Sequence, residues 1–194
     1  MTRLVKHLSL ATLLCVAGAC SSFGHRCTQF PQTNGQYCLQ PIISRDLISM
    51  QQKVELNFND LHETMIVDLE VNAKGLQFIA FTPLGQKLIQ INDDNFKITS
   101  NNVLPTHLDS MMLVGLLQLA LWPSDAVLNG LKAPLIMKEF AQERIFFSNG
   151  KIVMSIQYAD SFMPHNQLSI NMPHINLRLD INQLLITPKE NHAQ

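Results

Sequence analysis

The sequence carries few charges and no cluster of basic residues. Lysine and arginine together number 14, aspartate and glutamate number 15, and the formal net charge of the 194 residues is −1. Nucleic-acid binding depends on clustered Lys and Arg that contact many phosphates. We therefore expect no nucleic-acid partner.

The motifs of common enzymes and metal sites are also missing. The chain has no Gly-x-Ser-x-Gly nucleophile elbow, no glycine-rich phosphate loop and no His-Glu-x-x-His zinc pattern. His165 and His174 flank Pro164 and Pro173 and could approach each other across a hairpin, but two imidazoles without a carboxylate or thiolate make a weak metal site. We predict a protein that is not an enzyme and needs no metal or cofactor.

The amino-terminal segment has the pattern of a secretory signal. Arg3 and Lys6 precede a short apolar stretch, and small residues stand directly before Cys20. In bacteria such a cysteine is acylated and becomes the first residue of the mature chain. We predict a lipoprotein signal peptide at 1–19 and lipidation of Cys20. An ordinary signal peptide cut nearby, with Cys20 in a disulfide, is the alternative.

After this segment, no apolar run reaches the roughly 18–20 residues that span a bilayer. The longest, Met111 to Trp122, is interrupted by Gln118 and stops at Pro123. The chain is thus expected to be anchored to a membrane, not embedded in it. Ser21 stands where Asp is the familiar inner-membrane retention signal, so we expect a periplasm-facing lipoprotein of the outer membrane.

Two cysteines, Cys27 and Cys38, remain after Cys15 leaves with the signal and Cys20 takes the lipid. In an oxidising periplasm they most simply form a disulfide, and free thiols are the alternative. We interpret residues 20–41 as a lipidated tether with a disulfide loop, and 42–188 as one domain.

Apolar and polar residues alternate along most of the domain with a period of two, which indicates half-buried strands. Asn149-Gly150 is a strong hairpin signal. The expected strands are 65–71, 76–82, 84–92, 95–99, 137–148, 151–159, 167–172 and 174–185. Strands on both sides of a helical insertion predict a mainly β (α+β) fold, a curved antiparallel sheet with helices on its concave face.

The insertion at 106–122 predicts a helix that is apolar over most of its circumference. Thr106 or Asp109 can cap it, and Pro123 ends it. A second short helix, capped by Ser124, is expected at 124–131. Gly115 in mid-helix indicates that the helix closely approaches the sheet or a ligand at this point. The alternative is that the glycine arose by chance and is tolerated without a structural role.

Several segments, in order, resemble a known family. They are FTPLGQKLIQI (81–91), LLQLALWP (116–123), RIFFSNGKIVMSIQY (144–158) and the cysteine pair behind the lipidated cysteine. The sequence resembles outer-membrane lipoprotein localisation factors of the LolB type, in the LolA/LolB-like carrier superfamily. It is closer to an uncharacterised bacterial lipoprotein family found beside fatty-acid-synthase-like genes for aryl polyene pigments.

The resemblance implies a LolB-like half-barrel with a helical lid around a cavity for acyl chains. It also implies function at the outer membrane, with an acyl or polyene lipid, and envelope transport proteins, as partners. The chain shows no clear counterpart of the localisation factors' exposed apolar membrane-insertion loop. That departure favours a specialised lipid client over general lipoprotein sorting.

Apolar residues are the candidates for lipid binding. Methionine is well suited to such a site, because its flexible thioether adapts to lipid chains of different shapes. The same residues could instead pack only against each other. We expect Leu84, at the Pro83–Gly85 corner, to define the mouth of the cavity. The predicted ligand-binding residues are Leu69, Phe78, Ala80, Leu84, Ile89, Met111, Met112, Leu116, Met154, Ile156, Leu177 and Leu179.

These observations favour a protein that binds and transfers or localises a hydrophobic lipid or a lipoprotein client. The alternative is an envelope assembly or sensor lipoprotein of the same fold with a filled core.

Overall fold

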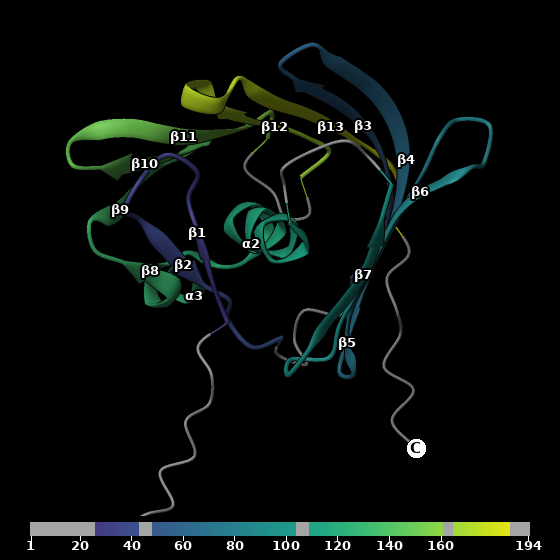
Figure 1. Ribbon diagram of the computed structural model, residues 1–194, viewed down its shortest axis with the longest axis horizontal. Coiled ribbons are helices and arrows are strands. Elements are labelled where there is room, and N and C mark those ends of the chain that lie inside the picture. The colour runs from purple at the N-terminus through teal and green to yellow at the C-terminus, as the bar shows by residue number, and fades with distance from the viewer. Residues whose placement is uncertain (1–25, 43–47, 104–108, 161–164, 187–194) are drawn as a thin grey trace, which may run out of the picture.

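A large antiparallel sheet dominates the computed structural model, which describes residues 26–42, 48–103, 109–160 and 165–186 (Figure 1). Its strands are β3 (Ile48–Phe58), β4 (Leu61–Asn72), β5 (Gly75–Phe81), β6 (Lys87–Asp93), β7 (Ile98–Asn102), β9 (Leu135–Phe140), β10 (Glu143–Ser148), β11 (Lys151–Tyr158), β12 (Gln167–Met172) and β13 (Leu177–Ile186). They lie in the order β7-β6-β5-β4-β3-β13-β12-β11-β10-β9. The sheet curves without closing into a barrel, because β7 and β9 remain its two edges in the described part of the chain.

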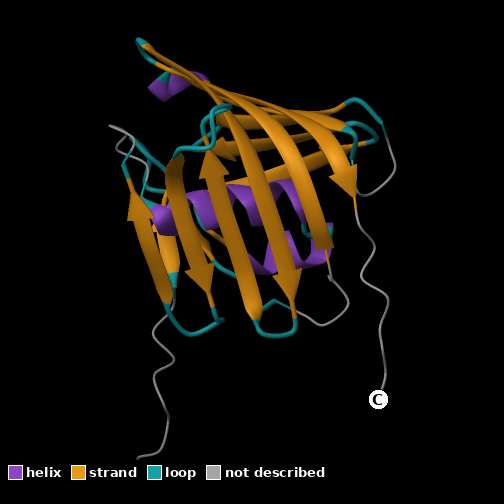
Figure 2. Cartoon of the chain, turned by 90° about the vertical axis from the view of Figure 1, so that its right-hand side faces the viewer, coloured by secondary structure: helices purple, strands orange, loops and turns teal. Residues whose placement is uncertain are grey.

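Helix α2 (Ser110–Leu121) lies on the concave side of this sheet, followed by the short helix α3 (Ser124–Gly130) (Figures 1 and 2). A small second sheet contains β1 (Cys27–Gln29), β2 (Gln36–Cys38) and β8 (Leu131–Lys132), in that order. A 3-10 turn, η1 (Pro173–Ile175), joins β12 to β13. The expectation of a mainly β fold, with a curved antiparallel sheet and helices on its concave face, is confirmed.

The alternation of apolar and polar residues explains the two faces of the sheet. In β4, Met65, Val67, Leu69 and Val71 are buried while Asp68 is exposed. In β13, Leu177, Leu179 and Ile181 are buried while Arg178 is exposed. Since successive side chains of a strand point to opposite faces, these rows place one continuous apolar surface on the inside of the curve.

The hairpin at Asn149-Gly150 forms as predicted. Both residues have positive φ, 51° and 77°, and Ser148 pairs with Lys151 across the turn. The turn uses left-handed backbone that glycine and asparagine adopt at low cost. The strand expected at 137–148, however, is two strands, β9 and β10, joined at Ala141-Gln142. That turn has no glycine, proline or asparagine to mark it, so the sequence pattern missed it.

Three further predicted strands begin later than expected, among them the one at 174–185, because Pro173–Ile175 form η1 and β13 begins at Leu177. Residues 84–86 and 95–97 lie in turns, so β6 begins at Lys87 and β7 at Ile98. Asn95 has a φ of 70°, and the Asp94 carboxylate accepts hydrogen bonds from two turn amides, which explains the later start of β7. No strand was predicted at β3, although Val54, Leu56 and Phe58 alternate there with polar residues.

Helix α2 begins and ends close to the predicted positions. Asp109 is its N-cap, and the Asp109 carboxylate accepts a hydrogen bond from the Met112 amide at 2.7 Å. Thr106 lies outside the described residues. The predicted cap of α3 is wrong: Pro123 takes the N-cap position, and the Ser124 hydroxyl instead donates to the Glu139 carboxylate.

Candidate functional site

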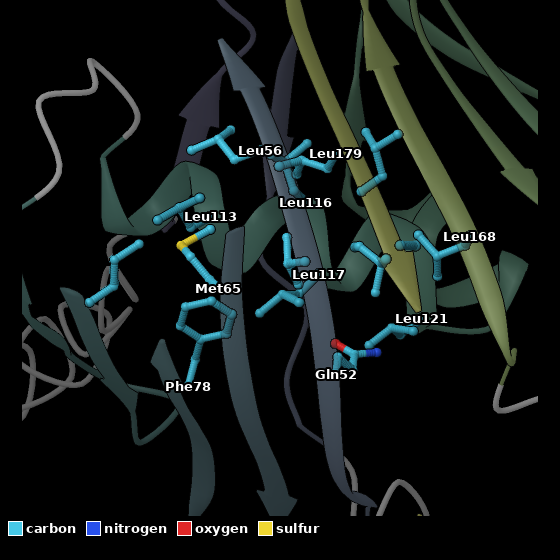
Figure 3. Close-up of a pocket in the computed structure, with 15 residues that line it drawn as sticks. Gln52, Leu56, Met65, Phe78, Leu113, Leu116, Leu117, Leu121, Leu168 and Leu179 are labelled. Carbon is cyan, nitrogen blue, oxygen red and sulfur yellow. The ribbon is translucent and has the colours of Figure 1, made fainter. Parts of the chain in front are cut away.

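An apolar cavity lies between α2 and the concave face of the large sheet (Figure 3). The cavity has a volume of about 60 Å³. All of its lining side chains but one are apolar, and the exception is Gln52. The lining residues are Gln52, Val54, Leu56, Met65, Phe78, Ile89, Leu113, Leu116, Leu117, Ala120, Leu121, Leu168, Ile170, Leu179 and Ile181.

One face of α2 forms the wall of this cavity opposite the sheet. Its members are Leu113, Leu116, Leu117, Ala120 and Leu121. This spacing of three and four places all five on one side of a helix. The cavity therefore faces the flank of Leu113, Leu117 and Leu121, not the row of Met111, Met112 and Leu119.

The other face of α2 packs against the small amino-terminal sheet. A Cβ on Gly115 would lie 3.2 Å from Thr28 Cγ2 and 3.6 Å from Tyr37 Cδ1, so the close approach is to β1 and β2. Gln118 is fully buried: its Oε1 accepts from the Tyr37 hydroxyl at 3.1 Å and the Gln40 amide at 2.8 Å, and its Nε2 donates to the Gln40 carbonyl at 2.8 Å. Burial raises the pKa of Tyr37, against a weaker lowering effect of Arg144.

This arrangement explains why α2 is apolar nearly all round. It is covered by the small sheet on one side and faces the cavity on the other, so it has no fully solvated face. Gln118 interrupts the apolar run in the sequence, and the structure shows that it fastens residues 37–40 to the helix. A single polar residue inside an apolar helix is the sequence signal for such a contact.

The carboxyl-terminal end of α2 is held by side chains from β10 and β11. Arg144 Nη1 donates to the carbonyls of Leu119 and Trp122, each at 2.9 Å, and the Tyr158 hydroxyl donates to the Ala120 carbonyl at 2.9 Å. The guanidinium also places a positive charge at the negative end of the helix dipole. Burial raises the pKa of Tyr158 to about 12, although nearby Arg144 lowers it in part.

Glu139 completes this cluster from β9. Its carboxylate accepts from Arg144 Nε at 2.8 Å and from the Ser124 hydroxyl. Partial burial alone would raise the pKa of Glu139, but the hydrogen bonds from Ser124 and Arg144 lower it below its ordinary value of 4.5. The sequence alone does not indicate this cluster, because its members come from four separate elements and share no motif.

The predicted ligand-binding residues occupy different positions. Those that line the cavity are Phe78, Ile89, Leu116 and Leu179. Those buried in the surrounding core without lining it are Leu69, Ala80, Met112, Met154, Ile156 and Leu177. Met111 is partly buried against the core. Lipid binding by this set stays a prediction.

Leu84 does not lie at the mouth of the cavity. It is 98% exposed at the tip of the β5–β6 turn, and it is not among the lining residues. The Gly85 amide donates to the Thr82 carbonyl at 2.9 Å, and Gly85 has a φ of 86°. This tight turn carries Leu84 away from the sheet instead of over its rim. The chain thus has an exposed apolar loop tip, contrary to the expectation that it has none.

The other candidate residues have simpler surroundings. Cys27 and Cys38 form the predicted disulfide across β1 and β2, whereas Cys20 lies outside the described residues. His165 contacts Asp160 at 3.1 Å and His174 contacts the Pro31 carbonyl at 2.8 Å, so the two histidines sit at opposite ends of β12 and do not meet.

Within the described ranges there is no group of three or more His, Cys, Asp or Glu side chains that could hold a metal ion. Nor does any helix in these ranges combine the length and apolar character needed to cross a membrane.

Comparison with known proteins places the chain in a family. No curated protein matches it. A solved structure that it resembles is the crystal structure of a domain described as an outer membrane lipoprotein-sorting protein from Vibrio parahaemolyticus, with a TM-score of 0.40, 6% sequence identity, and 74% of this chain and 87% of that chain covered. A family model matches residues 49–185, from β3 to the end of β13. The chain therefore belongs to the DUF3261 family of proteins of unknown function.

Proposed function

We propose that the protein is a non-enzymatic carrier of the bacterial envelope that binds a lipid chain between α2 and the large sheet. Cys20 would anchor it in the outer membrane, facing the periplasm. The client is an acyl or aryl-polyene lipid, or the lipid chain of a lipoprotein. The observation that carries this proposal is the cavity, whose lining is apolar apart from Gln52.

The cavity at rest is smaller than such a client. Its volume of about 60 Å³ is room for a few water molecules. Burying a chain of about a dozen methylenes releases roughly 0.8 kcal/mol for each one, which is ample to drive side chains and a helix apart. Binding therefore requires α2 to move away from the sheet.

The hydrogen bonds of α2 indicate which end moves. Arg144 and Tyr158 hold the carbonyls of its last turn, whereas in the described chain the first turn has one hydrogen bond from outside the helix, from the Thr28 hydroxyl to Met112 Sδ at 3.7 Å. We expect the amino-terminal half, with Leu113 and Leu116, to swing while the end near Trp122 stays in place. Release to a membrane would follow the reverse movement.

The small resting volume also favours a second function, that of an envelope assembly or sensor subunit with a filled core. Native mass spectrometry of the protein purified from its envelope separates the two. A carrier is expected to retain a lipid chain at a ratio near one per protein, and added long-chain lipid should displace it. Protein that is free of lipid, and that takes up none from vesicles or from solution, would favour the second function.

A further inference from the structure

Gln52 interrupts an otherwise apolar row on the concave face of β3. Its neighbours on that face are Met50, Val54 and Leu56, and all four side chains are buried, with Gln52 only 4% exposed. Gln52 lines the cavity, at the end away from Leu56 and near Leu121 (Figure 3). Leu56 lies four residues along the strand from Gln52, or about 13 Å at 3.3 Å per residue.

The Gln52 amide makes fewer hydrogen bonds than it is able to make. An amide side chain has two N–H donors and an oxygen with two acceptor positions. Gln52 Nε2 donates to Gln183 Oε1 at 3.5 Å, and within the described chain no donor reaches Gln52 Oε1. Gln52 Oε1 is not among the fully buried unpartnered atoms of the described chain, so it keeps accessible surface in the wall of the cavity, where a ligand can reach it.

Gln183 determines which atom of Gln52 is left free. Gln183 Nε2 donates to the Gln51 carbonyl at 3.3 Å and to the Leu185 carbonyl. These bonds direct Gln183 Oε1 toward Gln52 Nε2, since β3 and β13 pair these two residues directly. The Gln52 nitrogen is thus engaged, and its oxygen is the group that a ligand can use. The free group is an acceptor, so its ligand must be a donor.

We infer that the lipid client carries a hydroxyl group, which donates a hydrogen bond to Gln52 Oε1 while its chain lies along the cavity toward Leu56. This inference rests on the proposed carrier function and names the class of its client. An ionised carboxylate is a poor fit, because it has no hydrogen to donate and none of the described lining residues carries a positive charge. A long-chain alcohol, alkyl phenol or hydroxyacyl chain satisfies both the acceptor and the apolar wall.

The test compares two ligands, one with this donor and one in which a methyl group replaces the donated hydrogen. The full chain with Cys20→Ser is loaded with the neutral dye Nile red, and 1-dodecanol or its methyl ether displaces the dye. We expect the alcohol to bind about fivefold more tightly than the ether, as one net hydrogen bond provides. The Gln52→Leu variant should bind both ligands but should lose the preference for the alcohol over the ether. Gln51→Leu is the matched control on the opposite face of the same strand and should keep it.

The outcomes separate this inference from the carrier function. Equal affinities for alcohol and ether in the wild-type chain, or an unchanged preference in Gln52→Leu, would overturn the hydroxyl assignment while lipid binding stands. Failure of both ligands to displace the dye, or of the dye to bind, would overturn the carrier function itself. Gln52→Met provides a second variant without the amide, and thermal unfolding confirms that each variant is folded.

Discussion

Replacing Ala120 with methionine tests whether lipid occupies the space between α2 and the sheet. Ala120 is 2% exposed and lines the cavity, and its carbonyl accepts the Tyr158 hydroxyl, a bond that the substitution leaves in place. Methionine adds about three heavy atoms on an unbranched, adaptable side chain. It should therefore fill the cavity without forcing the sheet and the helix apart.

Filling this cavity should raise stability and weaken lipid binding together. At about 24 cal/mol for each Å³ of empty volume, 60 Å³ corresponds to at most about 1.4 kcal/mol in the free energy of unfolding. For a chain of this size, that is a rise of roughly 3–6 °C in Tm. Three methylenes of lipid displaced at about 0.8 kcal/mol each should weaken binding by about 2.4 kcal/mol, or roughly fiftyfold.

Dye displacement by a long-chain alcohol measures the affinity, and circular dichroism measures Tm. Ala126→Met is the matched control, because Ala126 on α3 packs against the core without lining the cavity. The reasoning is refuted if Ala120→Met folds with an unchanged or higher Tm and binds lipid as tightly as the wild type.

Two further predictions concern stability. The pKa of Glu139 is lower in the folded chain, so its hydrogen bonds to Ser124 and Arg144 stabilise the fold fully above pH 4.5, and this stabilisation is lost as the pH falls through the folded pKa. In urea unfolding, the free energy of unfolding of Glu139→Gln should therefore fall less steeply with decreasing pH than that of the wild type. An equal fall would contradict this. Replacing Cys27 and Cys38 with serine should lower the free energy of unfolding by about 2–3 kcal/mol, measured in the same assay. An unchanged value would show that the disulfide contributes nothing.

The position of α2 connects these predictions. Its sheet-facing side meets the cavity, and its other side meets the disulfide-linked hairpin through Gly115 and Gln118. Under the proposed carrier function, a movement of α2 that admits lipid would also shift residues 26–42.

Local patterns predicted much of the architecture. Strict alternation in β13, the Asn149-Gly150 turn and the apolar helix ending before Pro123 all lie close to their predicted positions. Each depends on neighbouring residues and on a period of 2 or 3.6, which a single sequence displays directly. The disulfide was similarly predictable, as the simplest pairing of the two cysteines that remain if Cys20 takes a lipid.

The sequence by itself thus determined a curved β layer with an apolar inner face and an apolar helix beside it. Only the tertiary structure decided which flank of that helix meets the cavity, that Leu84 points into solvent, and that Gln52 stands alone in an apolar wall. The physical reason is that local periodicity assigns a residue to a face of its own element. What lies opposite that face depends on residues far away in the chain, such as Gln183 beside Gln52 and Arg144 at the end of α2.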